Sequence, residues 1–235
     1  MVNKNGIRNI VGIIGNVVSF GLFASPLPTF IKIYKKGAVE EFSPNPYLAT
    51  IMNCLLWDFY GLPIVHPHST LVLTINSIGL VMEFSYIFTY LYFATKKQRV
   101  YVYKFLGLEL VFYMIVIGLT LGLLHTHEHR SMAIGILCVV FNIAMYAMPL
   151  DVMKKVITTK SVEYMPFLLS LTNCFNGTVW TTYGLIKFDV YIVTSNGAGV
   201  VLGLIQLILY AIYYKSTPVP AKPKEKPQNP ELELV

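Results

Sequence analysis

Charged residues are scarce in this chain of 235 residues, where Asp, Glu, Lys and Arg together make up 13%. A soluble domain carries about 25% charged residues, because its surface must face water. Hydrophobic residues make up 55% of the sequence, so most of the outer surface is expected to face lipid. The shortage of charge therefore excludes an ordinary soluble domain and a disordered chain, and it predicts an integral membrane protein.

Cysteines and catalytic motifs are scarce as well. The three cysteines, Cys54, Cys138 and Cys174, lie far apart in apolar runs, which excludes a disulfide framework and a cysteine zinc site. No phosphate-binding loop, redox motif or nucleophile–base pair occurs, so we expect neither an enzyme nor a cofactor. The run from His125 to His129 resembles a metal site, but its place between two spans favours a solvated loop. The net charge of +6 comes from short clusters between apolar runs, so nucleic acid is not an expected partner.

Long apolar runs are abundant, and seven of them approach the roughly 20 residues that a helix needs to cross a membrane. They cover about 8–31, 46–65, 70–94, 103–125, 131–153, 166–186 and 190–214. The runs are continuous and do not alternate, which favours helices over the strands of a membrane barrel. The first run is longer than a signal-peptide core, so we interpret it as the first span.

Basic residues predict the orientation of these spans. Only four of the eighteen Lys and Arg residues, Lys4, Arg8, Arg130 and Lys187, lie on the amino-terminal side of the membrane. Basic residues gather on the cytosolic side, so the amino terminus is expected outside and the carboxyl terminus in the cytosol. We expect the plasma membrane, with an internal membrane such as the vacuole as the alternative. The tail, residues 215–235, holds five prolines and alternating charges, and we expect it to be disordered.

An internal repeat predicts the architecture. Residues 24–27 (Ala-Ser-Pro-Leu) recur 123 positions later as 147–150 (Ala-Met-Pro-Leu), and residues 74–76 (Thr-Ile-Asn) recur 120 positions later as 194–196 (Thr-Ser-Asn). Spans one to three therefore repeat as spans five to seven, and both copies enter the membrane in the same direction. We predict an all-α membrane protein whose seven transmembrane helices form two parallel three-helix repeats joined by a linker helix. The predicted division is 1–94 for the first repeat, 95–130 for the linker, 131–214 for the second repeat and 215–235 for the tail.

Matched polar and aromatic residues lie where two such repeats would meet. Asn76 and Asn196 fall near the middle of spans three and seven, where repeat transporters bind their ligands. Amides both donate and accept hydrogen bonds, which suits a neutral, hydroxyl-rich ligand, although interhelical bonding is the alternative. Trp57 and Trp180 are matched in spans two and six, where their rings suit stacking on a sugar or, alternatively, an interfacial aromatic belt.

Prolines are matched as well. Pro26 and Pro149 lie near the ends of spans one and five, where they interrupt the helical hydrogen-bond ladder. Pro46 and Pro166 open spans two and six. Four prolines at one level predict a hinge.

Three carboxylates within the predicted spans could couple transport to an ion, but none has an acidic counterpart in the other repeat. Asp58 is the candidate proton site because it follows Trp57, and the alternative is that it faces a water-filled vestibule. Glu83 and Glu109 are expected to hydrogen-bond between helices or to lie near an interface.

Together these motifs resemble the SWEET family of sugar uniporters, over residues 7–214. The runs that carry the resemblance are 24–26, 53–57, 74–76, 160–166 and 206–210. Details near His125 and in the last span are similar to the plant members that transport hexoses.

The resemblance implies roles for particular residues. Those implied to contact sugar are Asn76, Asn196, Trp180, Trp57, Ser19, Leu22 and Met145. Those implied to form gates are Pro26, Pro46, Pro149, Pro166, Tyr60 and Asp189. Two departures from the family occur at Trp57, where several members have a small polar residue, and at Asp58, where an apolar residue is usual.

The expected function is facilitative, bidirectional transport of a small sugar by alternating access, with a hexose such as glucose as the expected substrate. The expected partners are a mono- or disaccharide, the lipid bilayer and further copies of the chain. A proton-coupled sugar carrier, resting on Asp58, is the first alternative. A seven-helix receptor is the second, and the internal repeat argues against it.

Overall fold

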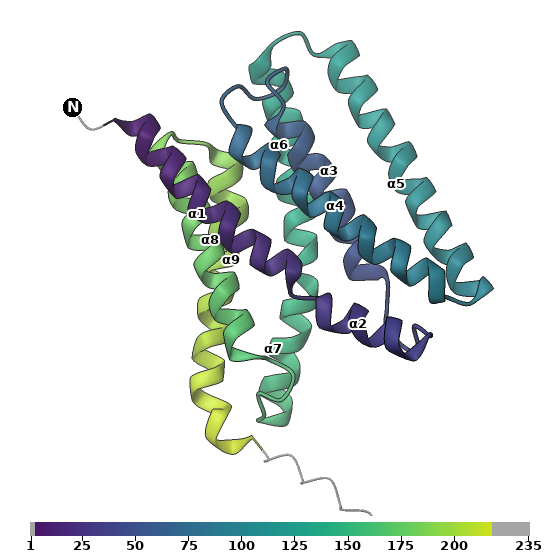
Figure 1. Ribbon diagram of the computed structural model, residues 1–235. Coiled ribbons are helices and arrows are strands. Elements are labelled where there is room, and N and C mark those ends of the chain that lie inside the picture. Colours follow the sequence, from purple (N-terminus) through teal and green to yellow (C-terminus); the bar gives the residue numbers. More distant parts are fainter. Residues whose placement is uncertain (1–2, 218–235) are drawn as a thin grey trace, which may run out of the picture.

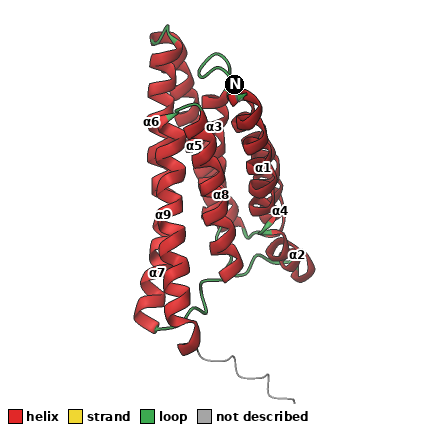
Figure 2. Ribbon diagram, turned by 90° about the vertical axis from the view of Figure 1, so that its left-hand side faces the viewer, coloured by secondary structure: helices red, strands yellow, loops and turns green. Residues whose placement is uncertain are grey.

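The structure is a computed structural model that describes residues 3–217. Within that range the chain forms helices and no strand (Figures 1 and 2). The helices are α1 (Lys4–Ala24), α2 (Leu27–Lys36), α3 (Asn45–Gly61), α4 (Thr70–Phe93), α5 (Lys96–Leu123), α6 (His127–Met145), α7 (Ala147–Thr159), α8 (Phe167–Ile186) and α9 (Val190–Tyr213), followed by a 3-10 turn, η1 (Tyr214–Ser216).

These helices account for the seven predicted spans, because α1 and α2 together form the first span and α6 and α7 together form the fifth. Five stretches are long and apolar enough to cross a membrane by length and composition: 4–36, 70–93, 96–123, 127–159 and 190–216. The other two spans are the central helices of the repeats. The α3 helix has 17 residues, and the 20 residues of α8 include Asn173 and Asn176. The seven-helix fold predicted from the sequence is confirmed.

Two prolines break the long helices at matched positions. Pro26 has no N–H to donate to the carbonyl of Leu22, and the N–H of Ser25 donates to that carbonyl instead, at 3.1 Å. In the second copy Pro149 cannot bond the carbonyl of Met145, and the chain interrupts the helix at Tyr146. The predicted interruptions of spans one and five are therefore present.

The two copies differ in their second helix. From Pro46 to Trp57 there are 11 positions, whereas from Pro166 to Trp180 there are 14, so α8 is almost one turn longer. Pro46 lies in the first turn of α3, whereas Pro166 precedes α8 as its N-cap. The loop after α3 is correspondingly longer than the loop after α8, which restores the spacing before Asn76 and Asn196.

The first helix of each repeat packs between the repeats. The α1 helix contacts both α4 and α8, and α6 contacts both α3 and α9. Close approach depends on glycine: a Cβ atom on Gly15 of α1 would lie 2.9 Å from the ring of Trp180 on α8. The linker helix α5 packs on α3, α4 and α6, and stands at the edge of the bundle in Figure 1.

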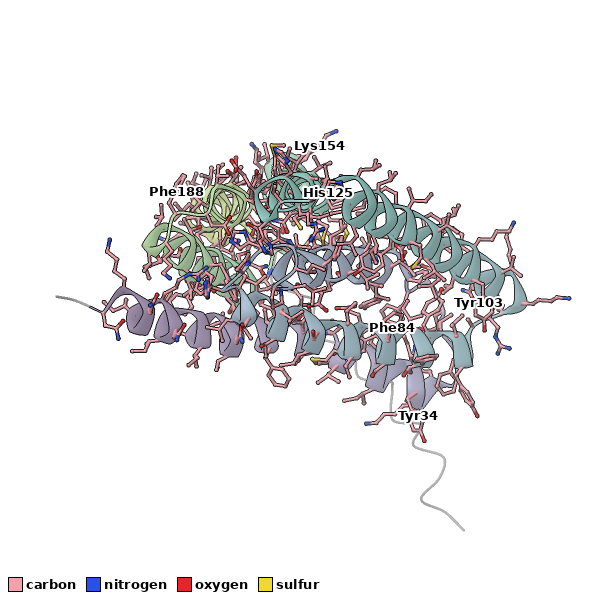
Figure 3. All side chains as sticks on the ribbon, turned by 90° about the horizontal axis from the view of Figure 1, so that it is seen from above. Tyr34, Phe84, Tyr103, His125, Lys154 and Phe188 are labelled. Carbon is pink, nitrogen blue, oxygen red and sulfur yellow. The ribbon has the colours of Figure 1, made fainter. Side chains whose placement is uncertain are left out.

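Apolar and aromatic side chains cover the outside of the bundle. Tyr34, Tyr103 and Phe188 are all more than half exposed, and they point away from the helices in the view from above (Figure 3). Such a surface fits lipid rather than water.

Most of the predicted disordered tail, residues 218–235, lies outside the described residues. Its first residues are ordered, contrary to the prediction. The hydroxyl of Ser216 donates to the carbonyl of Lys160 at 2.7 Å, and the N–H of Val162 donates to Oγ1 of Thr217 at 2.9 Å. The second repeat therefore extends slightly past its predicted end.

Candidate functional site

A cavity of about 470 Å³ lies between the two repeats. Its wall contains all seven residues expected to contact a ligand: Ser19, Leu22, Trp57, Asn76, Met145, Trp180 and Asn196. They come from six helices of both repeats, and the volume is typical of small-molecule sites. The fold thus brings residues up to 177 positions apart to one place.

Two asparagines face this cavity in the same way. Nδ2 of Asn76 donates to the carbonyl of Val72 at 2.8 Å, and Nδ2 of Asn196 donates to the carbonyl of Ile192 at 2.9 Å. Each bond stays within one helix, and within residues 3–217 neither amide bonds another helix. The structure therefore contains no interhelical hydrogen bond from either amide among the described residues. The oxygen and the second N–H of each amide have no partner there.

Trp180 is held in one orientation by its neighbours. Its Nε1 donates to Oγ of Ser19 at 3.0 Å, and that hydroxyl donates to Oδ1 of Asn176 at 2.6 Å. The ring of Tyr183 meets the indole edge to face at 5.2 Å. These contacts fix the orientation of the Trp180 indole in the cavity wall. No sequence motif indicated that Asn176 would have a role at the cavity.

Trp57 is the repeat counterpart of Trp180, but the two indole N–H groups differ in their hydrogen bonding. Its ring meets Tyr60 edge to face at 5.5 Å, as Trp180 meets Tyr183. No described residue accepts a hydrogen bond from Nε1 of Trp57. Both indoles are 6% exposed, which contradicts an interfacial belt.

A buried hydrogen bond joins the two repeats near the cavity. The hydroxyl of Tyr60 donates to Oδ2 of Asp189 at 2.8 Å, across the two repeats. Oδ1 of Asp189 accepts from the N–H groups of Tyr191 and Ile192, both at 3.1 Å, and so caps α9. Neither Tyr60 nor Asp189 lines the cavity, and their bond lies beyond its end.

His66, in the loop after α3, reinforces this contact and was not predicted. Its ring stacks on Tyr60 at 4.7 Å, and its Nε2 lies 3.3 Å from Oδ2 of Asp189. Its Nδ1 lies 2.9 Å from the hydroxyl of Ser131 on α6. Burial lowers the pKa of His66. The loop after α8 is shorter and has no residue that matches His66, so the internal repeat gave no signal for this residue.

Comparison with known proteins identifies the family. The family described as "Sugar efflux transporter for intercellular exchange" matches twice, over residues 9–98 and 132–218. The chain belongs to this family, the SWEET transporters. Its members are transporters and not enzymes.

Among similar SWEET proteins is the bidirectional sugar transporter SWEET5 of Arabidopsis thaliana, 54% identical over 92% of this chain and 90% of its own length. SWEET4 of the same plant is 56% identical over 93% of this chain and 87% of its own. A solved eukaryotic SWEET transporter superposes with a TM-score of 0.86 at 35% identity, covering 90% of this chain and 99% of that one. The similarity therefore spans nearly the whole fold.

Three of the four prolines expected to gate this SWEET chain line the other end of the cavity. They are Pro26, Pro46 and Pro149. Pro166 is not part of the wall. It lies 14 positions before Trp180, whereas Pro46 lies only 11 positions before Trp57. The prolines therefore do not form a four-fold symmetric ring around the cavity.

The carboxylates are placed differently from the predictions. Asp58 does not line the cavity, and its carboxylate instead accepts from the hydroxyl of Ser77 on α4, at 3.1 and 3.2 Å. Glu83 does line the cavity. Neither Glu83 nor Glu109 hydrogen-bonds another helix within the described residues, so the first of the two alternatives predicted for them is wrong, and a place near an interface stays a prediction.

The histidine run lies on the surface. His125, His127 and His129 are exposed, and Oγ1 of Thr126 accepts from the N–H of His129 at 3.3 Å to begin α6. Residues 3–217 contain no cluster of three or more His, Cys, Asp or Glu side chains that could hold a metal.

The Tyr60–Asp189 bond can be tested with a native cysteine. Tyr60→Phe removes the hydroxyl that donates to Asp189, a charge-assisted bond worth about 1.5–3 kcal/mol. Cys138, fully buried in the same cluster as Tyr60, should then react about tenfold faster or more with a water-soluble maleimide. The measurement uses purified full-length protein with Cys54 and Cys174 replaced by Ala.

Tyr183→Phe is the matched control, because Tyr183 occupies the repeat position of Tyr60 and its hydroxyl makes no hydrogen bond within residues 3–217. Equal labelling of the two variants would show that the Tyr60–Asp189 bond does not hold this end closed.

Proposed function

We propose that the chain carries a small sugar across a membrane in both directions, by alternating access and without ion coupling. The observation that carries this proposal is the pair of amides at Asn76 and Asn196, which face one cavity with hydrogen-bonding capacity to spare. The related SWEET5 and SWEET4 proteins of Arabidopsis are bidirectional sugar transporters by name, which supports the same function here.

The chemistry of the wall suits a neutral polyol. Sugar hydroxyls both donate and accept, so they can bond the amide oxygens and the remaining amide N–H groups, each for about 0.5–1.5 kcal/mol. The free N–H of Trp57 adds a donor, and the two indole faces can cover the C–H faces of a pyranose ring. The cavity wall contains no Lys, Arg or His side chain, which disfavours an anionic substrate.

Alternating access would use the two ends of the cavity. The Tyr60–Asp189 bond closes one end, and the helix breaks at Pro26 and Pro149 provide hinges toward the other. The distribution of basic residues supports placing the closed end outside and the proline end in the cytosol. In this assignment the structure is the inward-facing state.

The same distribution of basic residues supports an amino terminus outside and a carboxyl terminus in the cytosol. We propose the plasma membrane as the location, and the family resemblance supports a homo-oligomer. The proposed functional units are the repeats 1–94 and 131–214, with 95–130 as the linker between them.

Hexose preference is proposed from the side chains at the helix breaks. Leu22 and Met145 are repeat counterparts, and each precedes its proline by four residues. Both line the cavity, so they narrow it from α1 and α6 where a second sugar ring would need space.

The first prediction about transport concerns the amides of Asn76 and Asn196. Asn76→Ala and Asn196→Ala should each lower kcat/KM for glucose about 5- to 150-fold, because each leaves sugar hydroxyls without partners, at about 1–3 kcal/mol. The assay is radiolabelled glucose uptake into proteoliposomes, with equal protein insertion verified. Thr74→Val, an exposed position on the same helix, should keep normal uptake. Normal rates in both Ala variants would place the binding site elsewhere.

Ion coupling generates the second prediction. Since Asp58 lies outside the cavity and bonds Ser77, Asp58→Asn should keep downhill flux at the wild-type rate and pH dependence. The same liposomes, given an imposed proton or sodium gradient, should bring glucose to equilibrium and no further. Accumulation above equilibrium in the wild type, lost in Asp58→Asn, would establish the proton-coupled alternative.

The third prediction concerns size. The wild type should transport glucose in preference to sucrose, and Met145→Val should raise sucrose transport relative to glucose. Such a change removes only part of one side chain, so the preference should shift by about 1–3 kcal/mol at most and should not reverse completely. Met148→Val, on the exposed face of α7, is the matched control. A wild-type protein that carries sucrose better than glucose would refute the size argument.

A further inference from the structure

Glu83 is a buried carboxylate in the cavity wall with no hydrogen-bonding partner. Its residue is 3% exposed, and Oε2 is buried without any donor. Neither carboxylate oxygen accepts a hydrogen bond from residues 3–217. Leaving such a group unpaired away from water is costly, so its position in the wall calls for a ligand that donates hydrogen bonds.

The surroundings of Glu83 contain no balancing charge. Its neighbours in the cavity wall include no Lys, Arg or His side chain, and no described ion pair involves Glu83. Tyr86, one turn further along α4, already donates its hydroxyl to the carbonyl of Phe23 at 2.8 Å. Within the described residues, Glu83 therefore has neither a cation in the cavity wall nor a donor bonded to it.

Two further residues of the cavity wall, Asn53 and Tyr47, come from α3, which packs on the α4 helix of Glu83. Oδ1 of Asn53 is buried without a partner among the described residues. The hydroxyl of Tyr47 makes no hydrogen bond to a residue within 3–217. Glu83 and Asn53 together offer acceptors, and Tyr47 can donate or accept. This combination matches a ligand with adjacent hydroxyl groups.

The carboxyl group occurs in one repeat only. The repeat counterpart of Glu83 is Gly203, where a Cβ atom would lie 2.8 Å from Cβ of Cys174. The second repeat therefore has no room for an equivalent side chain. Glu83 follows Asn76 by seven residues, or two turns, which places it about 10 Å nearer the proline end.

We propose that Glu83, Asn53 and Tyr47 form a second sugar-binding subsite, between the asparagine pair and the proline end of the cavity. The carboxyl group of Glu83 hydrogen-bonds adjacent sugar hydroxyls as the sugar passes between the asparagine pair and that end. This subsite rests on the proposed function, and it makes Glu83 a specificity-determining residue for sugars that carry those hydroxyls.

The test measures selectivity as well as rate. Glucose and a series of monodeoxyglucoses are compared as substrates of the full-length protein in proteoliposomes. Glu83→Met should lower kcat/KM for glucose about tenfold, since it removes the hydrogen bonds between the Glu83 carboxyl group and the sugar hydroxyls. It should also lose the discrimination between glucose and at least one deoxyglucose. Glu83→Gln, which keeps one acceptor oxygen, should retain part of that discrimination.

Glu109→Met is the matched control, because Oε2 of Glu109 is also buried without a partner but Glu109 is not part of the cavity wall. It should leave the selectivity profile unchanged. If Glu83→Met inserts poorly into the membrane, the sugar selectivity of Glu83→Gln decides whether the subsite exists.

Three results would overturn the subsite. Wild-type selectivity in both Glu83 variants would show that the carboxylate does not touch the sugar. Loss of proton-driven accumulation in Glu83→Gln, with selectivity intact, would make Glu83 a proton site instead. A wild-type protein that transports none of the sugars would overturn the subsite and the proposed function together, whereas the first two results leave sugar transport standing.

Discussion

The contact between the two repeats near Trp57 depends on the two oxygens of one carboxylate. Oδ1 of Asp189 caps α9, and Oδ2 accepts the hydroxyl of Tyr60 from the other repeat. The cap orients the side chain within its own helix, so the bond between repeats forms with little further loss of conformational freedom. The bond between the repeats is thus attached to the start of α9, the helix that carries Asn196.

The repeats share a backbone plan but not their hydrogen bonding. Trp180 donates its N–H to Ser19, whereas Trp57 has no acceptor among the described residues. The counterpart of Glu83 in the other copy is a glycine, where Cys174 fills the space. A sugar has no twofold symmetry, so an asymmetric wall can bind it in one orientation. Duplication provides the enclosure, and later divergence provides the recognition.

The internal repeat explains why much of the fold was predictable. Matched positions such as Trp57 and Trp180 fall on equivalent faces, so the pattern indicated that they would lie in one cavity wall, whereas Ser19, Leu22 and Met145 were expected there only from the family resemblance. The side of each helix on which a given side chain lies was harder to predict. Successive residues of a helix point about 100° apart, so Asp58 faces Ser77 while its neighbour Trp57 faces the cavity. His66 was missed because the shorter loop of the second repeat has no residue that matches it.

The packing of α1 on α8 has a consequence for biosynthesis. The hydroxyl of Ser19 bonds Asn176, 157 positions later in the chain. At about 5–20 residues per second, the ribosome adds that partner roughly 8–30 s after Ser19. During this interval the glycine surface of α1 that receives Trp180 has no partner from its own chain, so α1 must remain in the bilayer beside lipid or the insertion machinery. The first span to be made is among the last to reach its final packing.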